Sequence, residues 1–233
     1  MSLQWHEFAA KEQLDAQLAA TIAADLKAAI AARGTAGLAV SGGRTPAGLF
    51  KALSTNTEVN WSKVVITLID ERWVPVDHAD SNERTVRQNL LVGPAAEATF
   101  ISPVSTAATP HEGLAEIEAR LTKLPAPIDV AILGMGDDGH TASLFPNAPE
   151  LEATCASTAL VAAVTPPIAP HKRITLTLPT IAKARHVIVH ITGEGKKSLL
   201  ETAMAEEKPL TEQYPIRRVL DQSSGSKEVF WAA

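Results

Sequence analysis

The sequence DVAILGMGDDGHTASLFP, residues 129–146, joins a short apolar run to a glycine-rich turn. The four apolar residues Val130 to Leu133 predict a buried strand. Three glycines with GxGxxG spacing and then a histidine come next: Gly134, Gly136, Gly139 and His140. In open α/β sheets, ligands bind in loops at the carboxyl ends of strands, and histidine titrates near neutral pH. The segment therefore predicts an α/β fold with a ligand site in this turn.

The rest of the chain alternates strand-like and helix-like segments. The expected strands are residues 37–40, 64–69, 129–133, 159–164, 173–178 and 186–191, and short apolar pieces follow at 218–220 and 228–231. The expected helices are residues 7–33, 82–91, 111–124, 180–184 and 193–204, and two more begin near Pro46 and His140. This alternation predicts an open, mostly parallel sheet that is covered by helices on both faces. No internal repeat or linker interrupts the pattern, so we expect one domain over residues 1–233.

The composition narrows the classes of function. The net charge of −5 argues against nonspecific nucleic-acid binding, which relies on basic patches that neutralise phosphates. The longest helical segment, residues 14–32, carries charged residues, so we expect no membrane span. Cys155 is the only cysteine and no signal-peptide pattern opens the sequence, which together favour a cytoplasmic protein. We expect a monomer or a weak homo-oligomer that acts on a small molecule.

A dinucleotide site is the first alternative for the glycine-rich turn. That motif requires an acidic residue about 20 positions further on, which holds the ribose. Here the next expected strand ends at Val164 and Thr165 without a carboxylate, and Asp137 and Asp138 in the loop would repel a pyrophosphate. A nucleotide is therefore not expected. A metal site is not expected either, because these aspartates and His140 have no second histidine or cysteine at ligand spacing.

His140 is better explained as a catalytic base. A histidine with a pKa of about 6.5 is largely neutral at cellular pH and can accept a proton from water. Asp138, two residues earlier, would orient the ring or stabilise its protonated form. The structural alternative is that His140 caps the next helix and Asp138 is only a turn residue. Three other histidines are expected to be structural or exposed: His171, His186 and His190.

A second glycine-rich turn, residues 41–46, lies between an expected strand and an expected helix. Backbone amides and the helix dipole at such a position favour an anion. The residues that would bind it are Ser41, Gly42, Gly43, Arg44 and Thr45. Thr45 would also cap the helix, and Pro46 suits the helix's first turn. The alternative is a structural turn without a ligand, and the missing P-loop lysine argues against a nucleotide triphosphate.

The charged triplet Asp70-Glu71-Arg72 ends the strand-like run 64–69 and would lie at the same sheet edge. The planar fork of Arg72 suits a phosphate group, and the carboxylates would pair with arginine or contact a sugar hydroxyl. The alternative is a solvated charged turn. Arg173, which opens a later strand, would supply a second cation, although Lys172 is equally available.

Four motifs taken together resemble the 6-phosphogluconolactonase family. They are SGGRTP (41–46), DERWVP (70–75) with DSN (80–82), GMGDDGHTASLFP (134–146) and RITLTLP (173–179). The resemblance covers nearly the whole chain in the expected order. It implies a fold like that of glucosamine-6-phosphate deaminase and ribose-5-phosphate isomerase, with no metal or organic cofactor. It also implies hydrolysis of 6-phospho-D-glucono-1,5-lactone to 6-phospho-D-gluconate in the oxidative pentose phosphate pathway.

The resemblance assigns expected roles to individual residues. His140 matches the family's general base and Asp138 the aspartate of the DGH pattern, whose role stays open. The expected substrate-binding residues are Ser41, Gly42, Gly43, Arg44, Thr45, Asp70, Arg72, Gly136, Gly139 and Arg173. Loop amides around Gly136 to Gly139, or a nearby cation, would stabilise the oxyanion.

Two rival functions follow from the same resemblance. A glucosamine-6-phosphate deaminase would continue the GxGxDGH motif with an AFNEP-like segment that carries a glutamate, whereas residues 142–146 here are ASLFP. A sugar-phosphate-sensing regulator would need an attached DNA-reading module and a basic helix, and the N-terminal helical segment is rich in alanine and nearly neutral.

Overall fold

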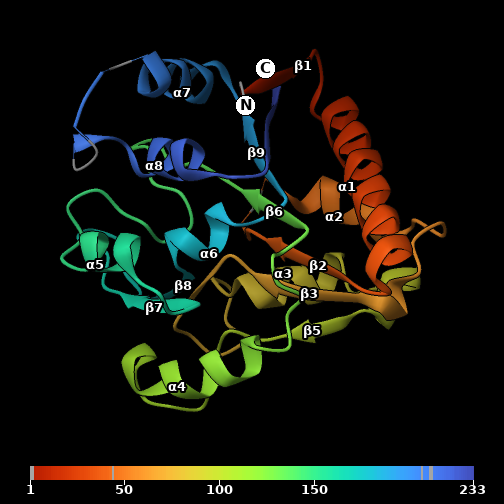
Figure 1. Ribbon diagram of the computed structural model, residues 1–233, viewed down its shortest axis with the longest axis horizontal. Helices are drawn as coiled ribbons and strands as arrows, with labels where there is room; N and C mark the ends of the chain where they lie inside the picture. The colour runs from red at the N-terminus through yellow and green to blue at the C-terminus, as the bar shows by residue number, and fades with distance from the viewer. Residues whose placement is uncertain (1–2, 44, 206, 210–211) are drawn as a thin grey trace.

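The computed structural model describes residues 3–43, 45–205, 207–209 and 212–233. Its main element is a seven-stranded sheet in which every neighbouring pair is parallel, with the order β1-β10-β9-β6-β2-β3-β5. These strands are β1 (Gln4–Phe8), β2 (Ala36–Val40), β3 (Val64–Leu68), β5 (Thr99–Ile101), β6 (Val130–Leu133), β9 (His186–Thr192) and β10 (Ser226–Ala232). The expected open parallel sheet is thus confirmed (Figure 1).

Helices cover both faces of this sheet (Figure 1). One face packs against α1 (Lys11–Arg33), α2 (Ala47–Ser54) and α3 (Asn82–Asn89). The other face packs against α4 (Pro110–Leu121), α5 (Leu151–Ala156), α6 (Leu178–Ala182), α7 (Glu194–Ala205) and α8 (Pro215–Gln222). Strand β6 shows why residues 130–133 include no polar residue. Val130 and Ile132 belong to the hydrophobic core beside α1, and Ala131 and Leu133 belong to the core on the opposite face. A strand buried on both faces needs apolar residues at every position.

A second, three-stranded sheet is a feature that the sequence analysis missed. It has the order β4-β8-β7 and is antiparallel, with β4 (Asp70–Arg72), β7 (Val161–Val164) and β8 (Arg173–Leu176). Strand β4 begins two positions after β3 ends, so the chain passes from the main sheet to the small sheet at Ile69. The charged triplet 70–72 is therefore a strand of the small sheet, and the alternative of a solvated charged turn is wrong.

The start of the chain also differs from expectation. Residues 4–8 form β1, which pairs with β10, and the first helix begins only at Lys11. A helix-like spacing of apolar residues holds from Leu14 onward, where Leu14, Leu18, Ile22 and Leu26 are fully buried. Gly34 ends α1 in the left-handed conformation, with its amide donating to the Ile30 carbonyl.

Two further local predictions were wrong. Residues 140–150 form a turn with one isolated bridge, Thr141 to Leu144, and not a helix. The reason is local, since Ala142 and Asn147 have positive φ angles of 53° and 63° that a helix does not allow. Helix α2 begins at Ala47 with Pro46 at its N-cap, and among the described residues no side chain caps it, so Thr45 is not the cap. The apolar piece 218–220, for which no element was predicted, lies in helix α8.

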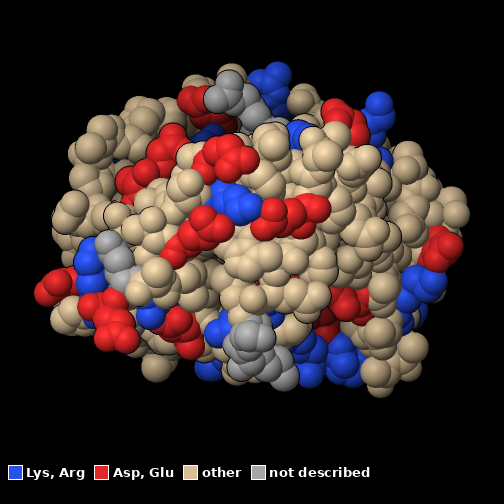
Figure 2. All heavy atoms as spheres, turned by 90° about the horizontal axis from the view of Figure 1, so that it is seen from above, with Lys and Arg blue, Asp and Glu red and all other residues tan. Residues whose placement is uncertain are grey.

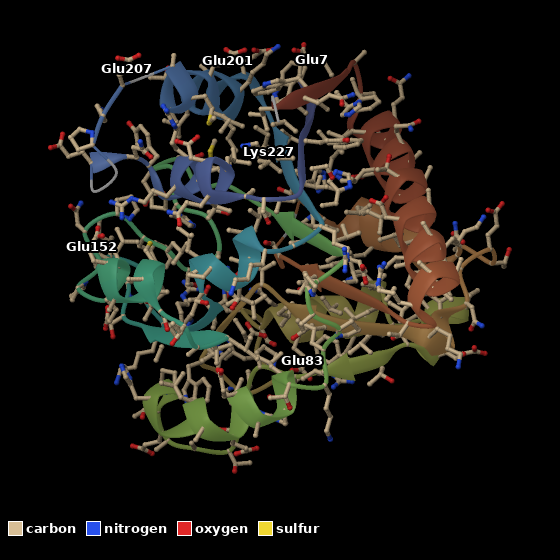
Figure 3. The ribbon with its side chains drawn as sticks, in the orientation of Figure 1. Glu7, Glu83, Glu152, Glu201, Glu207 and Lys227 are labelled. Carbon is tan, nitrogen blue, oxygen red and sulfur yellow. The ribbon has the colours of Figure 1, made fainter. Side chains whose placement is uncertain are left out.

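Ion pairs tie the outer elements together. Lys197 of α7 pairs with Glu7 of β1 at 2.7 Å, and Arg218 of α8 pairs with Glu152 of α5 at 2.8 Å (Figure 3 labels both glutamates). On the face seen in Figure 2, basic and acidic side chains are interspersed. Of the helices in the described ranges, none combines the length and the apolar character that crossing a membrane requires.

Candidate active site

A cavity of about 500 Å³ lies where the carboxyl ends of β2, β6 and β9 meet the small sheet. Most of the predicted site residues line it: Ser41, Gly42, Gly43, Thr45, Asp70, Arg72, Gly136, His140 and Arg173. Arg44 lies outside the described residues. Asp138 and Gly139 belong to the loop beneath His140 and do not line the cavity wall. Segments far apart in the sequence thus converge at one place.

His140 and Asp138 form a hydrogen-bonded pair at the rim of this cavity. The ring atom Nδ1 of His140 lies 2.5 Å from Asp138 Oδ1, and the His140 backbone amide lies 3.2 Å from the same oxygen. Burial alone would raise the pKa of Asp138, but the charge of His140 and its hydrogen bonds together outweigh burial and lower it. Asp138 is therefore ionised at neutral pH and holds the ring by Nδ1, which leaves Nε2 for a ligand.

Gly136 lets the loop close tightly around this pair. A Cβ at Gly136 would lie 2.2 Å from two ring atoms of His140 and 2.7 Å from Asp138 Oδ1. Its amide donates to the His140 carbonyl at 2.8 Å, and the amide of Gly139 donates to the Gly136 carbonyl at 3.1 Å. Both of these amides are thus engaged within the loop.

Ser41 has a structural role in the second glycine-rich turn. Its hydroxyl donates to the Ile132 carbonyl at 3.0 Å and accepts from the Gly134 amide at 3.3 Å, which joins the ends of β2 and β6. Gly42 packs directly against Asn82, because a Cβ there would lie 2.2 Å from that side chain. The hydroxyl of this lining residue is therefore occupied by backbone partners.

Two arginines from the small sheet enter the cavity together. Arg72 of β4 and Arg173 of β8 are register partners, and Arg72 Nη1 donates to the Asp80 carbonyl at 2.6 Å. Arg173 is only 7% exposed, and its enclosed Nε has no hydrogen-bond partner within the described part of the chain. Burial lowers the pKa of Arg173, and the nearby carboxylate of Asp70 opposes this. A buried guanidinium with an unsatisfied N–H group fits an anionic ligand.

The other two charged residues of β4 have different partners. Asp70 lines the cavity, and its Oδ2 accepts a hydrogen bond from the buried hydroxyl of Ser143 at 2.6 Å. Glu71 is fully buried and points away from the cavity, toward the start of α3. It accepts hydrogen bonds from the amides of Arg72, Asn82 and Glu83 and from the Ser81 hydroxyl. Burial raises the pKa of Glu71 in spite of these hydrogen bonds.

Three lining residues were not singled out as site residues from the sequence. Lys196, in the first turn of α7, donates to the Met135 carbonyl and lies 3.7 Å from Asp137. It follows a strand and two glycines, the same signal that pointed to residues 41–46, so it could have been found. The Phe145 ring lies between the base and the arginines, 4.5 Å from the His140 ring centroid and 5.8 Å from Arg173 Cζ. His190, which was expected to be structural or exposed, is buried and also lines the cavity.

One group of side chains outside the cavity lining could hold a metal ion. Ligand atoms of His78, Asp80 and His171 lie within 4.8 Å of one another, and His171 Nε2 is 2.9 Å from Asp80 Oδ2. The sequence analysis had considered only Asp137, Asp138 and His140 as ligands. In the arrangement seen, His78 Nδ1 accepts from the Asp80 amide at 3.1 Å, so this nitrogen is already used.

The comparisons with known proteins agree with this fold. The family model for glucosamine-6-phosphate isomerases/6-phosphogluconolactonase matches residues 9–231. The chain belongs to this family of sugar-phosphate proteins.

Individual relatives are more specific. A 6-phosphogluconolactonase of Rhizobium meliloti is 42% identical over all of this chain and all of its own. The crystal structure of a 6-phosphogluconolactonase from Shewanella baltica is also 42% identical, covers 100% of this chain and 98% of its own, and has a TM-score of 0.96. A monomeric glucosamine-6-phosphate deaminase, 18% identical, covers 99% of this chain and 97% of its own with a TM-score of 0.79. The expected kinship of fold is confirmed.

Proposed function

We propose that this protein hydrolyses 6-phospho-D-glucono-1,5-lactone to 6-phospho-D-gluconate, the second step of the oxidative pentose phosphate pathway. The observation that carries the proposal is a histidine held by Nδ1 against an ionised aspartate, at a cavity that also contains two arginines. Relatives over the full length of the chain that bear the name 6-phosphogluconolactonase support it.

The arginines hold the phosphate end of the substrate in this proposal. Arg173 is desolvated and offers an Nε–H group that no described residue binds, and Arg72 presents its guanidinium from the neighbouring strand. Bidentate contacts of guanidinium with phosphate are strong and geometrically specific. Residues 41–43 and Thr45 form the adjacent wall. The lactone ring then extends from the small sheet toward His140.

His140 acts as the general base. Its Nε2 removes a proton from water, the water oxygen forms a bond to C1 of the lactone, and the carbonyl electron pair moves to the exocyclic oxygen. When this tetrahedral intermediate collapses, the bond from C1 to the ring oxygen breaks. The imidazolium then returns its proton to that leaving oxygen, and the carboxylic acid product loses its proton to solvent. Asp138 stabilises the imidazolium between the two transfers, because its carboxylate lies 2.5 Å from Nδ1.

A cation is the better candidate for stabilising the oxyanion. The amides of Gly136 and Gly139 already donate within the loop. Lys196 lines the same cavity, next to the loop that carries His140, and has three N–H groups of which one binds the Met135 carbonyl. We assign Lys196 this role, since positive charge placed where negative charge develops lowers the barrier.

The rival reactions have less support. A deaminase would need a carboxylate in the segment after His140, and Ala142 to Pro146 contain none. Instead, Ser143 from this segment donates to Asp70 and Phe145 packs on His140. A sugar-phosphate sensor would not need a histidine–aspartate pair with a free Nε2.

One set of assays tests the proposal. The lactone is generated in place from glucose 6-phosphate, and its disappearance is followed at mildly acidic pH, where its spontaneous hydrolysis is slow. Wild type and His140→Ala are compared, with ammonium release from glucosamine 6-phosphate measured in parallel. Wild-type protein should accelerate lactone loss and release no ammonium. A lactone decay equal to the protein-free rate would refute the function, whereas an unchanged rate for His140→Ala would refute only the assigned base.

The setting of this activity is also part of the proposal. We propose that residues 1–233 act as one domain, because both hydrophobic cores rest on the same seven-stranded sheet. We further propose a cytoplasmic monomer or weak homo-oligomer that needs no nucleic-acid partner. Sedimentation of the purified protein and fractionation of cells test these statements.

A further inference from the structure

His190 is a buried polar residue at the cavity that the mechanism above does not use. It lies near the carboxyl end of β9, is 4% exposed, and lines the cavity beside Ile191 and Thr192. Its Nε2 is enclosed and has no hydrogen-bond partner among the described residues. Its other ring nitrogen, Nδ1, is not enclosed and likewise makes no hydrogen bond to them. Buried polar atoms without partners are rare and call for an explanation.

Asp15 of α1 supplies the explanation for Nε2. Its Oδ1 is the other enclosed, unpartnered atom of this region, and it lies 3.5 Å from His190 Nε2. Its Oδ2 is 2.5 Å from Lys11 Nζ, so Asp15 and Lys11 form an ion pair. The two unpartnered atoms therefore face each other at a distance slightly beyond a normal hydrogen bond.

This juxtaposition selects one tautomer of the ring. With the proton on Nε2, a partial positive charge lies 3.5 Å from a carboxylate oxygen, which is electrostatically favourable without being a normal hydrogen bond. With the proton on Nδ1, two lone pairs would face each other in a buried place, which is costly. Burial, together with the charge of Lys11, lowers the pKa of His190 to about 3, so the ring is neutral at physiological pH. Nδ1 then presents a lone pair, and it is the nitrogen that is not enclosed.

We propose that His190 is a specificity residue that recognises one hydroxyl group of the sugar phosphate: Nδ1 accepts a hydrogen bond from it, and Asp15 holds the tautomer that makes Nδ1 an acceptor. The inference rests on the proposed function and extends it. Among the other neutral polar side chains of the lining, Ser41 and Thr141 already use their hydroxyls on backbone groups, and Asn82 donates to the Asp70 carbonyl. Unlike a hydroxyl, which can also donate, the lone pair of His190 Nδ1 can only accept. A site built to bond a hydroxyl rejects an analogue that lacks it, because a buried polar atom is then left unpaired.

The test measures kcat/KM for the parent lactone and for the 2-deoxy, 3-deoxy and 4-deoxy lactones. Each deoxy compound lacks one hydroxyl group. When two proteins are compared on the same compound, the ratio of their kcat/KM values no longer depends on the intrinsic reactivity of that compound. We expect wild type to lose about 10- to 100-fold with one of the three, in line with one buried hydrogen bond. For His190→Phe, kcat/KM for the parent lactone should fall by the same factor. Its kcat/KM for that deoxy lactone should be no lower than its value for the parent lactone. His190→Phe discriminating among all three as wild type does would overturn the inference.

Two matched variants control for structural effects. His186→Phe makes the same change on the same strand at a histidine that binds Asp25 at 2.7 Å and does not line the cavity, so it should retain wild-type discrimination. His190→Asn keeps an acceptor near the position of Nδ1 and should retain most of the discrimination among the deoxy lactones. If His190→Asn lost the discrimination as fully as His190→Phe, the acceptor role would be wrong.

A spectroscopic experiment depends neither on an activity assay nor on the folding of a variant. In the 15N spectrum of wild-type protein, His190 should carry its proton on Nε2 and a lone pair on Nδ1. Added 6-phosphogluconate should shift the Nδ1 resonance, and inorganic phosphate alone should not. A proton found on Nδ1, or no shift with bound product, would overturn the inference even if the lactone were hydrolysed. Absence of lactone hydrolysis with the predicted shift intact would instead refute the proposed function.

Discussion

Arg72 and Arg173 are direct partners across the antiparallel strands β4 and β8, so two guanidinium groups project from neighbouring positions of the same sheet. Like charges placed opposite each other destabilise a strand pair. Arg72 accordingly contributes to the lowered pKa of Arg173, although burial is the larger cause. The repulsion is relieved when an anion lies between the two groups. The free protein therefore carries a destabilising pair that a phosphate group would neutralise.

The first prediction concerns this pair. Arg173→Met should raise the KM for the lactone at least about 10-fold with a smaller effect on kcat, because charge-assisted hydrogen bonds contribute about 1.5–3 kcal/mol each. Its melting temperature without ligand should equal or exceed that of wild type, since a buried unpaired N–H group is lost. Inorganic phosphate should raise the melting temperature of wild type and not of the variant. Lys27→Met, a change on the outer face of α1, is the control. A lowered kcat at unchanged KM would show that Arg173 does not bind the phosphate.

The second prediction separates the base from its orienting aspartate. His140→Gln should reduce kcat by about 10²- to 10⁴-fold, the usual contribution of a positioned base. Asp138→Asn should reduce kcat less, about 10- to 100-fold, because the imidazole remains but loses the carboxylate that stabilises its charged form. KM should change little in either variant. The double variant should be no slower than His140→Gln, and a further drop would mean that Asp138 acts independently.

The third prediction concerns metal ions. The proposed mechanism takes its base from His140 and its positive charges from Arg72, Arg173 and Lys196. The group formed by His78, Asp80 and His171 lies outside the cavity lining. Exhaustive dialysis against EDTA should therefore leave kcat and KM unchanged. Loss of activity that added zinc or magnesium restores would contradict the metal-free mechanism.

The fourth prediction follows from Glu71. Its pKa is raised in the folded protein by burial, so between about pH 4.3, the value in an unfolded chain, and the raised value the folded state holds the extra proton. This contribution to the free energy of unfolding therefore decreases as the pH rises through that window. Glu71→Gln lacks the titration and also presents an amide NH₂ group to N–H donors, which should cost about 2–4 kcal/mol.

Urea unfolding from pH 4 to 8 measures both effects. The free energy of unfolding of Glu71→Gln should lie further below that of wild type at pH 4 than at pH 7. Glu201→Gln, an exposed position on α7 that Figure 3 labels, should show neither the deficit nor the pH dependence. An equal deficit at every pH would show that Glu71 does not titrate in this range.

The sequence predicted the main sheet and most of the site because both depend on local signals. Continuous apolar runs such as 130–133 mark doubly buried strands, and glycine-rich turns after them mark the ligand edge. Strand β1 was missed because its residues 4–8 have no such run and form a strand only through pairing with β10. The segments of β7 and β8 were expected as strands, but the small sheet was missed because β4 is three charged residues whose partner strand lies about 100 positions away. The role of His190 depends on Asp15 across the core, which no local pattern reveals.

The passage of the chain from β3 into β4 at Ile69 has a further consequence. The proposed base rests on the parallel sheet and the proposed phosphate-binding arginines on the antiparallel one, with Phe145 wedged between them. The distance between the two sheets would then select substrates by length. It fits a substrate in which the phosphate group and the reacting carbon are separated by that same distance. Residues in the interface between the sheets, even those that never contact a ligand, would determine this distance.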